Sequence, residues 1–206
     1  MAWWQQRYRR LRYGQPVVVV SGLPRSGTSM MMKMLEAGGI PVWLDGVRTA
    51  DDQNPKGYYE LERVKELDKG LDKSWVREGR GRAVKVISSL LEYLPATNNY
   101  QVLFMNRNIQ EVLDSQSKML SQRGEADGSA SDAALEKFYE THLRKVKYFL
   151  AHEPGFSSLD VKYADVLADP EAMARRIRTF LGASLNVAGM TGAVDGQLYR
   201  NRQPRG

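Results

Sequence analysis

The stretch "PRSGTS", residues 24–29, has the residue types and the spacing of an anion-binding loop. Four consecutive valines, residues 17–20, stand shortly before it, and a helical pattern follows. A buried strand, a glycine-containing turn and the start of a helix together direct backbone N–H groups at one point, where the helix dipole also favours an anion. We therefore expect a phosphate group to bind at this loop.

The loop nevertheless differs from that of nucleotide hydrolases. In the pattern G-x-x-x-x-G-K-[ST], the lysine holds the outer phosphates and the hydroxyl group binds magnesium. Gly22 and Gly27 match the two glycines, but Thr28 occupies the place of the lysine, before Ser29. A second apolar run, "QVLFMNRN", ends in asparagine and arginine where an aspartate that orients magnesium would be expected. Both differences argue against magnesium-dependent phosphoryl transfer.

The elements around the loop alternate between short apolar runs and helical patterns. This alternation is typical of parallel βαβ units, and it predicts an α/β fold with a single P-loop-like parallel sheet flanked by helices. The segment 41–57 is expected to be a functional loop, 122–131 a surface connection, and the chain after Gly182 to lack helix. The expected strands are 16–21, 82–87, 101–106 and 157–163, and the expected helices are 27–37, 60–72, 108–121, 132–151 and 170–181.

Length and composition favour one globular domain over residues 1–206, with 1–15 as a basic aromatic extension. The sequence has no cysteine, which excludes disulfides, thiolate metal sites and cysteine nucleophiles. Its apolar runs are shorter than the roughly 20 residues that cross a bilayer, and its opening lacks the apolar stretch of a secretory signal. We therefore expect a cytoplasmic protein.

The formal net charge of +6 suits an anionic partner. Arginines and aromatic residues interleave in residues 3–13, a pattern that could serve an anionic membrane surface or a nucleic acid. We favour the alternative that this aromatic end packs on the domain. Similarly, the methionines of residues 30–34 are expected to be core residues and not an acceptor pocket.

Four stretches together resemble the sulfotransferases that use 3′-phosphoadenosine 5′-phosphosulfate (PAPS). "PRSGTS" resembles their 5′-phosphosulfate loop, and "VLFMNRNIQEVLDSQ" is similar to their second nucleotide motif, with Arg107 and Ser115 at the two ligand positions. "RAVKVISSLLEYLP" resembles the strand that carries a catalytic lysine, here Lys85. "VKYADVLADPEAMARRIRTFLG" resembles the segment whose tyrosine contacts adenine, here Tyr163. The resemblance covers roughly residues 16–182.

The resemblance implies PAPS as the co-substrate, adenosine 3′,5′-bisphosphate as a product, and no metal. A transferring sulfuryl group carries less charge than a phosphoryl group, so Arg25 and Lys85 can replace a metal as its electrostatic clamp. Other interpretations remain open: an exposed turn for Arg25, an exposed strand position for Lys85 and core packing for Tyr163. The implied nucleotide ligands are Arg25, Ser26, Gly27, Thr28, Ser29, Arg107, Ser115 and Tyr163, with Arg200 and Arg202 from a tail, 183–206, that could cover the nucleotide.

The general base is less closely defined by the resemblance. Cytosolic small-molecule sulfotransferases place a histidine two residues after the strand lysine, but Ile87 stands there in this chain. Other branches use a glutamate upstream of the strand, and Glu60 in "NPKGYYE" fits that role. Asp51 and Asp52 are the alternatives, and Glu60 could instead serve as a helix N-terminal residue that interacts with the dipole.

These features favour transfer of a sulfuryl group from PAPS to a hydroxyl group of a small-molecule or lipid-like acceptor. An amine acceptor is favoured less. This function requires no nucleic-acid partner. Two other classes remain open: a P-loop kinase-like enzyme, which would require magnesium and ATP, and a nonenzymatic basic protein that binds nucleic acid.

Overall fold

Four parallel strands form the central sheet of the computed structural model, which describes residues 3–45, 59–70, 72–122 and 132–194. The strands are β1 (Val17–Gly22), β2 (Ala83–Lys85), β3 (Tyr100–Asn106) and β4 (Phe156–Lys162), in the order β2-β1-β3-β4. Each neighbouring pair is parallel. The predicted α/β fold, a parallel sheet flanked by helices, is confirmed.

Both faces of the sheet are buried, which explains the continuous run of valines in β1. Successive side chains of a strand point to opposite faces. Val18 and Val20 belong to one hydrophobic cluster, whereas Val17 and Val19 belong to the other. A strand covered on both faces therefore needs apolar residues at every position.

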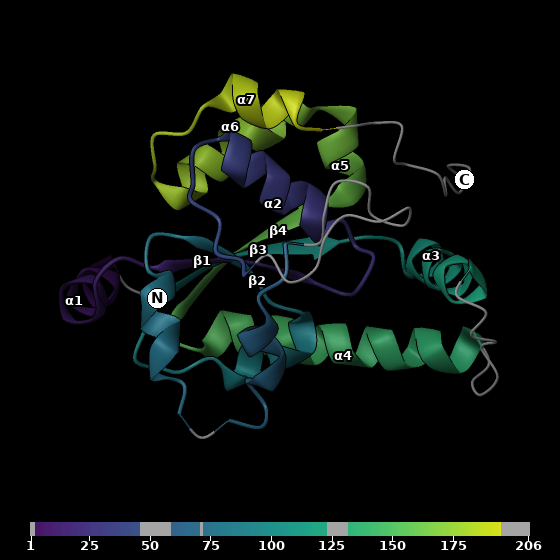
Figure 1. Cartoon of the computed structure of the whole chain (residues 1–206), viewed down its shortest axis with the longest axis horizontal. Helices are drawn as coiled ribbons and strands as arrows, with labels where there is room; N and C mark the ends of the chain where they lie inside the picture. The colour runs from purple at the N-terminus through teal and green to yellow at the C-terminus, as the bar shows by residue number, and fades with distance from the viewer. Residues whose placement is uncertain (1–2, 46–58, 71, 123–131, 195–206) are drawn as a thin grey trace.

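Four helices cover the first face: α2 (Thr28–Ala37), α5 (Tyr163–Ala168), α6 (Pro170–Leu181) and α7 (Val187–Gly192) (Figure 1). Met31, Met32 and Met34 of α2 are fully buried in this layer. The methionine-rich stretch is therefore part of the hydrophobic core, as expected.

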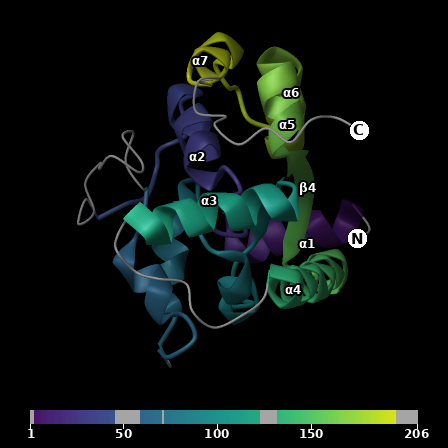
Figure 2. The ribbon, with the colours of Figure 1, turned by 90° about the vertical axis from the view of Figure 1, so that its right-hand side faces the viewer.

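The long helix α4 (Asp132–His152) covers the second face (Figure 1). Three 3₁₀ helices pack in the same layer: η1 (Glu62–Glu66), η2 (Ser74–Gly79) and η3 (Ser88–Tyr93). Helix α3 (Ile109–Gln122) follows β3 at the carboxyl edge of the sheet (Figure 2). The loop, α3 and the ends of β1 and β3 thus meet at one edge.

The N-terminal segment forms a helix, α1 (Trp3–Tyr13), which the sequence analysis did not predict. Arg9 anchors it: Nε donates to Asn99 Oδ1 at 3.0 Å, and Nη2 donates to the carbonyl oxygens of Ala96 and Asn98 at 3.0 and 2.9 Å. Tyr8 is 58% exposed, so this aromatic side chain does not pack as expected. An arginine at the amino edge of the sheet attaches the helix instead.

The prediction of one helix over 60–72 is wrong, because the segment forms the short 3₁₀ helix η1 and then a turn. Leu61, Val64 and Leu67 are its buried residues, and they are spaced by three. That spacing matches a 3₁₀ helix, which has three residues per turn and rarely runs long.

Two further boundaries differ from expectation. Tyr163 begins α5 and is not the last residue of β4. The chain after Gly182 does contain a helix, α7, which Asn186 caps by accepting from the Gly189 N–H at 3.0 Å. A helix of six residues is too short to display a hydrophobic period.

Within the described residues, no helix combines the length and the apolar character needed to cross a membrane. The residues 195–206, which include Arg200 and Arg202, lie outside the described part. The same holds for Asp51 and Asp52. The assignment of the whole chain to one domain, with separate functions for 1–15 and 183–206, stays a prediction.

Candidate active site

The loop "PRSGTS" lies where β1 ends at Gly22 and α2 begins at Thr28. Gly22 pairs with Met105 of β3, so the carboxyl ends of these two strands are adjacent. In open parallel sheets, ligands bind at the carboxyl ends of neighbouring strands whose connections leave in opposite directions. Here β1 connects toward β2 and β3 toward β4, on opposite sides of this point.

Glycine is required at two positions of the loop. Gly27 has φ +98° and caps α2, and a Cβ there would lie 2.5 Å from Cδ2 of Tyr163. Gly22 has φ +151°, and its Cβ would lie 2.7 Å from the carbonyl oxygen of Met105. Only glycine combines these backbone angles with such close approach. The loop is therefore pressed against Tyr163 and β3.

Ser26 contributes an oxygen atom that has no hydrogen-bond partner among the described residues. Its side chain is 1% exposed, and its Oγ is buried. A buried hydroxyl without a partner costs free energy. An anion in the loop would offer it an acceptor.

Arg107 is fixed by three contacts from different elements. Its Nε donates to Oε2 of Glu111 at 2.9 Å, its Nη1 donates to the carbonyl oxygen of Arg25 at 3.1 Å, and its guanidinium lies 4.7 Å from the ring centroid of Tyr163. The side chains of Arg107 and Glu111 are only 9% and 7% exposed. Arg107 is thus held against the loop by groups of the protein itself.

Arg25 points toward the same cluster. Its backbone adopts the left-handed region, with φ +68°, and its Nε donates to Ser115 Oγ at 3.0 Å. Ser115 is buried. The structure therefore brings together four residues that the sequence analysis had assigned to the nucleotide site, Arg25, Arg107, Ser115 and Tyr163.

Tyr163 is 5% exposed, with its ring lying beside Gly27 and Arg107. The interpretation as a core residue is correct for the ring as it lies here. An aromatic ring beneath a guanidinium also keeps the cation in place. Contact with adenine stays a prediction.

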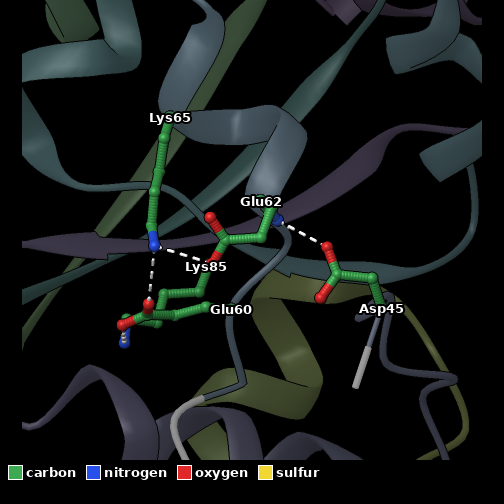
Figure 3. Close-up of polar contacts among 5 residues, drawn as sticks. All are labelled: Asp45, Glu60, Glu62, Lys65 and Lys85. Carbon is green, nitrogen blue, oxygen red and sulfur yellow. Dashed lines mark hydrogen bonds and ion pairs between the residues drawn. The ribbon is translucent and has the colours of Figure 1, made fainter. Parts of the chain in front are cut away.

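A second cluster contains Lys85 and Glu60, whose Nζ and Oε1 atoms lie 3.3 Å apart (Figure 3). Lys85 pairs with Val20 in the sheet, so it lies beside the end of β1. Its side chain is 12% exposed and that of Glu60 is 18% exposed. The interpretation of Lys85 as an exposed strand residue is therefore wrong. Glu60 precedes η1, which begins at Glu62, and does not form its first turn.

Tyr59 fixes the backbone beside Glu60. It has φ +51°, and its hydroxyl donates to Oε2 of Glu36, on α2, at 2.6 Å. Burial and this contact raise the pKa of Tyr59, so the hydroxyl remains a donor. Within the described residues, only Arg25 and Tyr59 are non-glycine residues with positive φ. Such strained positions cluster at functional sites, and here each adjoins a candidate functional cluster.

Two residues of these clusters were missed by sequence reasoning. Glu111 orients Arg107, and its position four residues later on a helix is the spacing at which such pairs meet. Lys65 contacts Glu60, with 3.4 Å between Nζ and Oε2. The spacing of three residues between Glu62 and Lys65 was the sequence signal that could have indicated this ion pair.

Comparison with known proteins shows to which family this chain belongs. The model of the sulfotransferase domain matches residues 15–201. The chain belongs to the sulfotransferase domain family. The match includes both clusters and begins after α1. No curated protein matches the sequence.

Solved structures show that this sulfotransferase chain shares its fold with other members. The sulfotransferase domain from the curacin biosynthetic pathway superposes with a TM-score of 0.54 at 15% identity, covering 88% of this chain and 78% of that one. Mouse sulfotransferase SULT7A1 complexed with PAP gives a TM-score of 0.51 at 16% identity, covering 87% of this chain and 62% of that one. At these identities the similarity concerns the fold.

Proposed function

We propose that this sulfotransferase moves a sulfuryl group from PAPS to a hydroxyl of a small-molecule or lipid-like acceptor, releasing adenosine 3′,5′-bisphosphate. The observation that carries the proposal is the pairing of Glu60 with Lys85 at 3.3 Å near the carboxyl end of β1. An acid–base group and a cation thus lie together close to an anion-binding loop. Family membership supports the reaction type.

The described residues fit a nucleotide with phosphate groups at both the 3′ and the 5′ positions. The loop backbone and the Ser26 hydroxyl would bind the 5′-phosphosulfate. This would give the buried Ser26 Oγ the hydrogen-bond partner that it lacks among the described residues. Arg107 and Ser115 would bind the 3′-phosphate, since guanidinium and hydroxyl groups are good donors to phosphate oxygens. The similar fold of a sulfotransferase complexed with PAP supports a nucleotide of this kind as the co-substrate.

In the proposed reaction, Glu60 accepts the proton of the acceptor hydroxyl while the acceptor oxygen forms a bond to sulfur. The bond from sulfur to the 5′-phosphate oxygen breaks, and the negative charge moves to the phosphate. Lys85 and Arg25 would stabilise this charge in a partly buried site, where fixed charges act strongly. PAPS supplies the activated sulfuryl group.

The proposal includes metal independence and a cytoplasmic location. The cations Arg25 and Lys85 can supply the electrostatic stabilisation that a metal provides in phosphoryl transfer. A chain without cysteine has no need of an oxidising compartment. An amine acceptor is compatible with the same residues.

The test is turnover of labelled PAPS with a panel of phenols, alcohols and amines, without added metal, measured as formation of adenosine 3′,5′-bisphosphate. We expect Glu60→Gln to lower kcat by roughly 10²- to 10⁴-fold, the contribution of a general base. Lys85→Met should lower it by roughly 10²- to 10³-fold, as for loss of a transition-state donor. The matched control is Glu66→Gln, which also removes a lysine-paired carboxylate, but one that is 63% exposed.

Near-normal turnover by Glu60→Gln would remove this residue as the base and direct attention to Asp51→Asn and Asp52→Asn. Hydrolysis of ATP with no turnover of PAPS would contradict the proposed function itself.

A further inference from the structure

The carboxylate of Glu60 is contacted by a lysine at each oxygen. Lys85 lies 3.3 Å from Oε1, and Lys65 lies 3.4 Å from Oε2 (Figure 3). Lys85 comes from the sheet and is 12% exposed, whereas Lys65 comes from η1 and is 49% exposed. The two cations therefore reach the carboxylate from the interior and from the solvent side.

The position of Lys65 is itself determined by local structure. Side chains three residues apart are eclipsed in a 3₁₀ helix, and Lys65 Nζ lies 2.7 Å from Oε1 of Glu62. The backbone N–H of Glu62 donates to Oδ2 of Asp45 at 2.6 Å, which fixes the start of η1 (Figure 3). Val64 and Leu67, on the other side of this turn, are buried in the core. The ammonium group of Lys65 thus contacts the carboxylates of both Glu60 and Glu62.

The hydrogen bond to Glu62 raises the pKa of Lys65 above its ordinary value. The ammonium group is therefore fully protonated throughout the neutral pH range. The charge of Lys65 therefore does not change with pH in that range.

We infer that Lys65 is a positioning residue for the proposed reaction, acting through Glu60. This inference rests on the proposed function. A developing negative charge near Lys85 competes with Glu60 for the lysine ammonium. Lys65, on η1, holds the other oxygen of the carboxylate, so that Glu60 stays charged and oriented until it accepts the proton.

The test compares Lys65→Met, Lys65→Arg and the control Lys69→Met over pH 5.5–8.5. Lys69 forms the equivalent pair three residues after Glu66, at 3.6 Å, and is 68% exposed. Loss of a neighbouring cation makes protonation of a carboxylate easier. We expect Lys65→Met to move the acidic limb of the kcat profile up by about half a pH unit, so that the loss is larger at pH 6 than at pH 8, in keeping with the modest strength of a half-exposed ion pair. Lys65→Arg should restore the wild-type profile, and Lys69→Met should retain it.

The double variant Glu60→Gln/Lys65→Met separates this inference from the proposed function. If Lys65 acts through Glu60, Lys65→Met has no further effect once Glu60 is replaced. A Lys65→Met profile that coincides with wild type, an equal loss at every pH, or an independent loss in the Glu60→Gln background would overturn the inference. In each of these cases a large loss for Glu60→Gln alone would leave the proposed function in place. Full activity of Glu60→Gln would contradict the base assignment on which the inference about Lys65 rests, and turnover of PAPS would still support the proposed function.

Discussion

Arg107 illustrates how single residues are prepared for a ligand in this protein. It is bound by Glu111, by the carbonyl oxygen of Arg25 and by the face of Tyr163, and it is 9% exposed. A buried arginine that lacks an anionic partner is costly, and the ion pair with Glu111 offsets part of that cost. The side chain therefore needs little rearrangement to bind a phosphate, which reduces the entropy lost on binding.

His142 provides a residue-scale prediction outside the proposed site. Its Nε2 lies 2.8 Å from Ser88 Oγ, and burial lowers its pKa below the ordinary value of 6.5. The unfolded chain therefore binds a proton more readily than the folded protein does. The contribution of neutral His142 to the free energy of unfolding is therefore fully present above pH 6.5 and is lost as the pH falls below that value.

We expect the melting temperature of the wild-type protein to fall between pH 7.5 and pH 5.5 more steeply than that of His142→Gln. Thermal denaturation at several pH values measures the difference. His152→Gln is the matched control, because His152 lies on the same helix but is exposed. Identical pH dependence of wild type and His142→Gln would contradict this role.

At the scale of elements, most long periodic segments were predictable, with α1 as an exception, whereas the short helical elements were not. The valines of β1, the apolar run of β3 and the pattern of α6, with Pro170 at its start and Gly182 after its end, gave strong signals. The short elements η1 and α7 owe their structure to tertiary contacts: Met190 of α7, for example, is fully buried against α2. Sequence pattern alone contains little of that information.

The same distinction applies to the candidate site. The loop glycines were predictable from their spacing, whereas Arg107 and Ser115 came from the resemblance to the second nucleotide motif, and their binding of a nucleotide stays a prediction. The contacts Arg25–Ser115 and Lys65–Glu60 depend on side-chain directions after folding. Arg25 was expected near the leaving phosphate, and its hydrogen bond to Ser115 connects it to the proposed 3′-phosphate site as well.

Gly27 gives an element-scale prediction, with Gly39 as a closely matched control. Their φ angles are +98° and +95°, so replacement by alanine causes similar backbone strain at both. A Cβ at Gly27 would collide with Tyr163 at 2.5 Å, whereas nothing lies within 4 Å of a Cβ at Gly39. We expect Gly27→Ala to be less stable than Gly39→Ala by roughly 1–3 kcal/mol, the usual cost of overpacking.

Urea denaturation of both variants measures this difference. Gly27→Ala should also lose affinity for adenosine 3′,5′-bisphosphate, and Gly39→Ala should retain it. Equal stability of the two variants would mean that the loop does not press against Tyr163.

On the scale of the whole molecule, the sheet separates two edges with different roles. Both candidate functional clusters lie at the carboxyl edge, near the ends of β1, β2 and β3. Helix α1 lies at the amino edge, where Arg9 contacts residues just before β3 (Figure 1). The family match begins at residue 15, so α1 lies outside the matched residues.

Arg9→Ala should therefore lower the free energy of unfolding by roughly 1–3 kcal/mol, since it removes hydrogen bonds from a charged group to three oxygens. Arg12→Ala is the control: its guanidinium contacts Tyr8 and the ring of Tyr13, both within α1 itself, and we expect a change of no more than about 0.5 kcal/mol. Chemical denaturation measures both. Nucleotide affinity should be unchanged in each variant, and a similar effect of the two substitutions on stability would contradict docking through Arg9.

The most direct test of the central claim is calorimetric titration of adenosine 3′,5′-bisphosphate and of AMP into the wild-type protein and Arg107→Ala, without added metal. These ligands differ only by the 3′-phosphate, which PAPS carries and ATP lacks. The wild-type protein should prefer the bisphosphate, and Arg107→Ala should lose about 2–3 kcal/mol of that preference, roughly 30- to 150-fold in affinity. Equal wild-type affinity for both nucleotides would contradict the assignment of PAPS as the co-substrate.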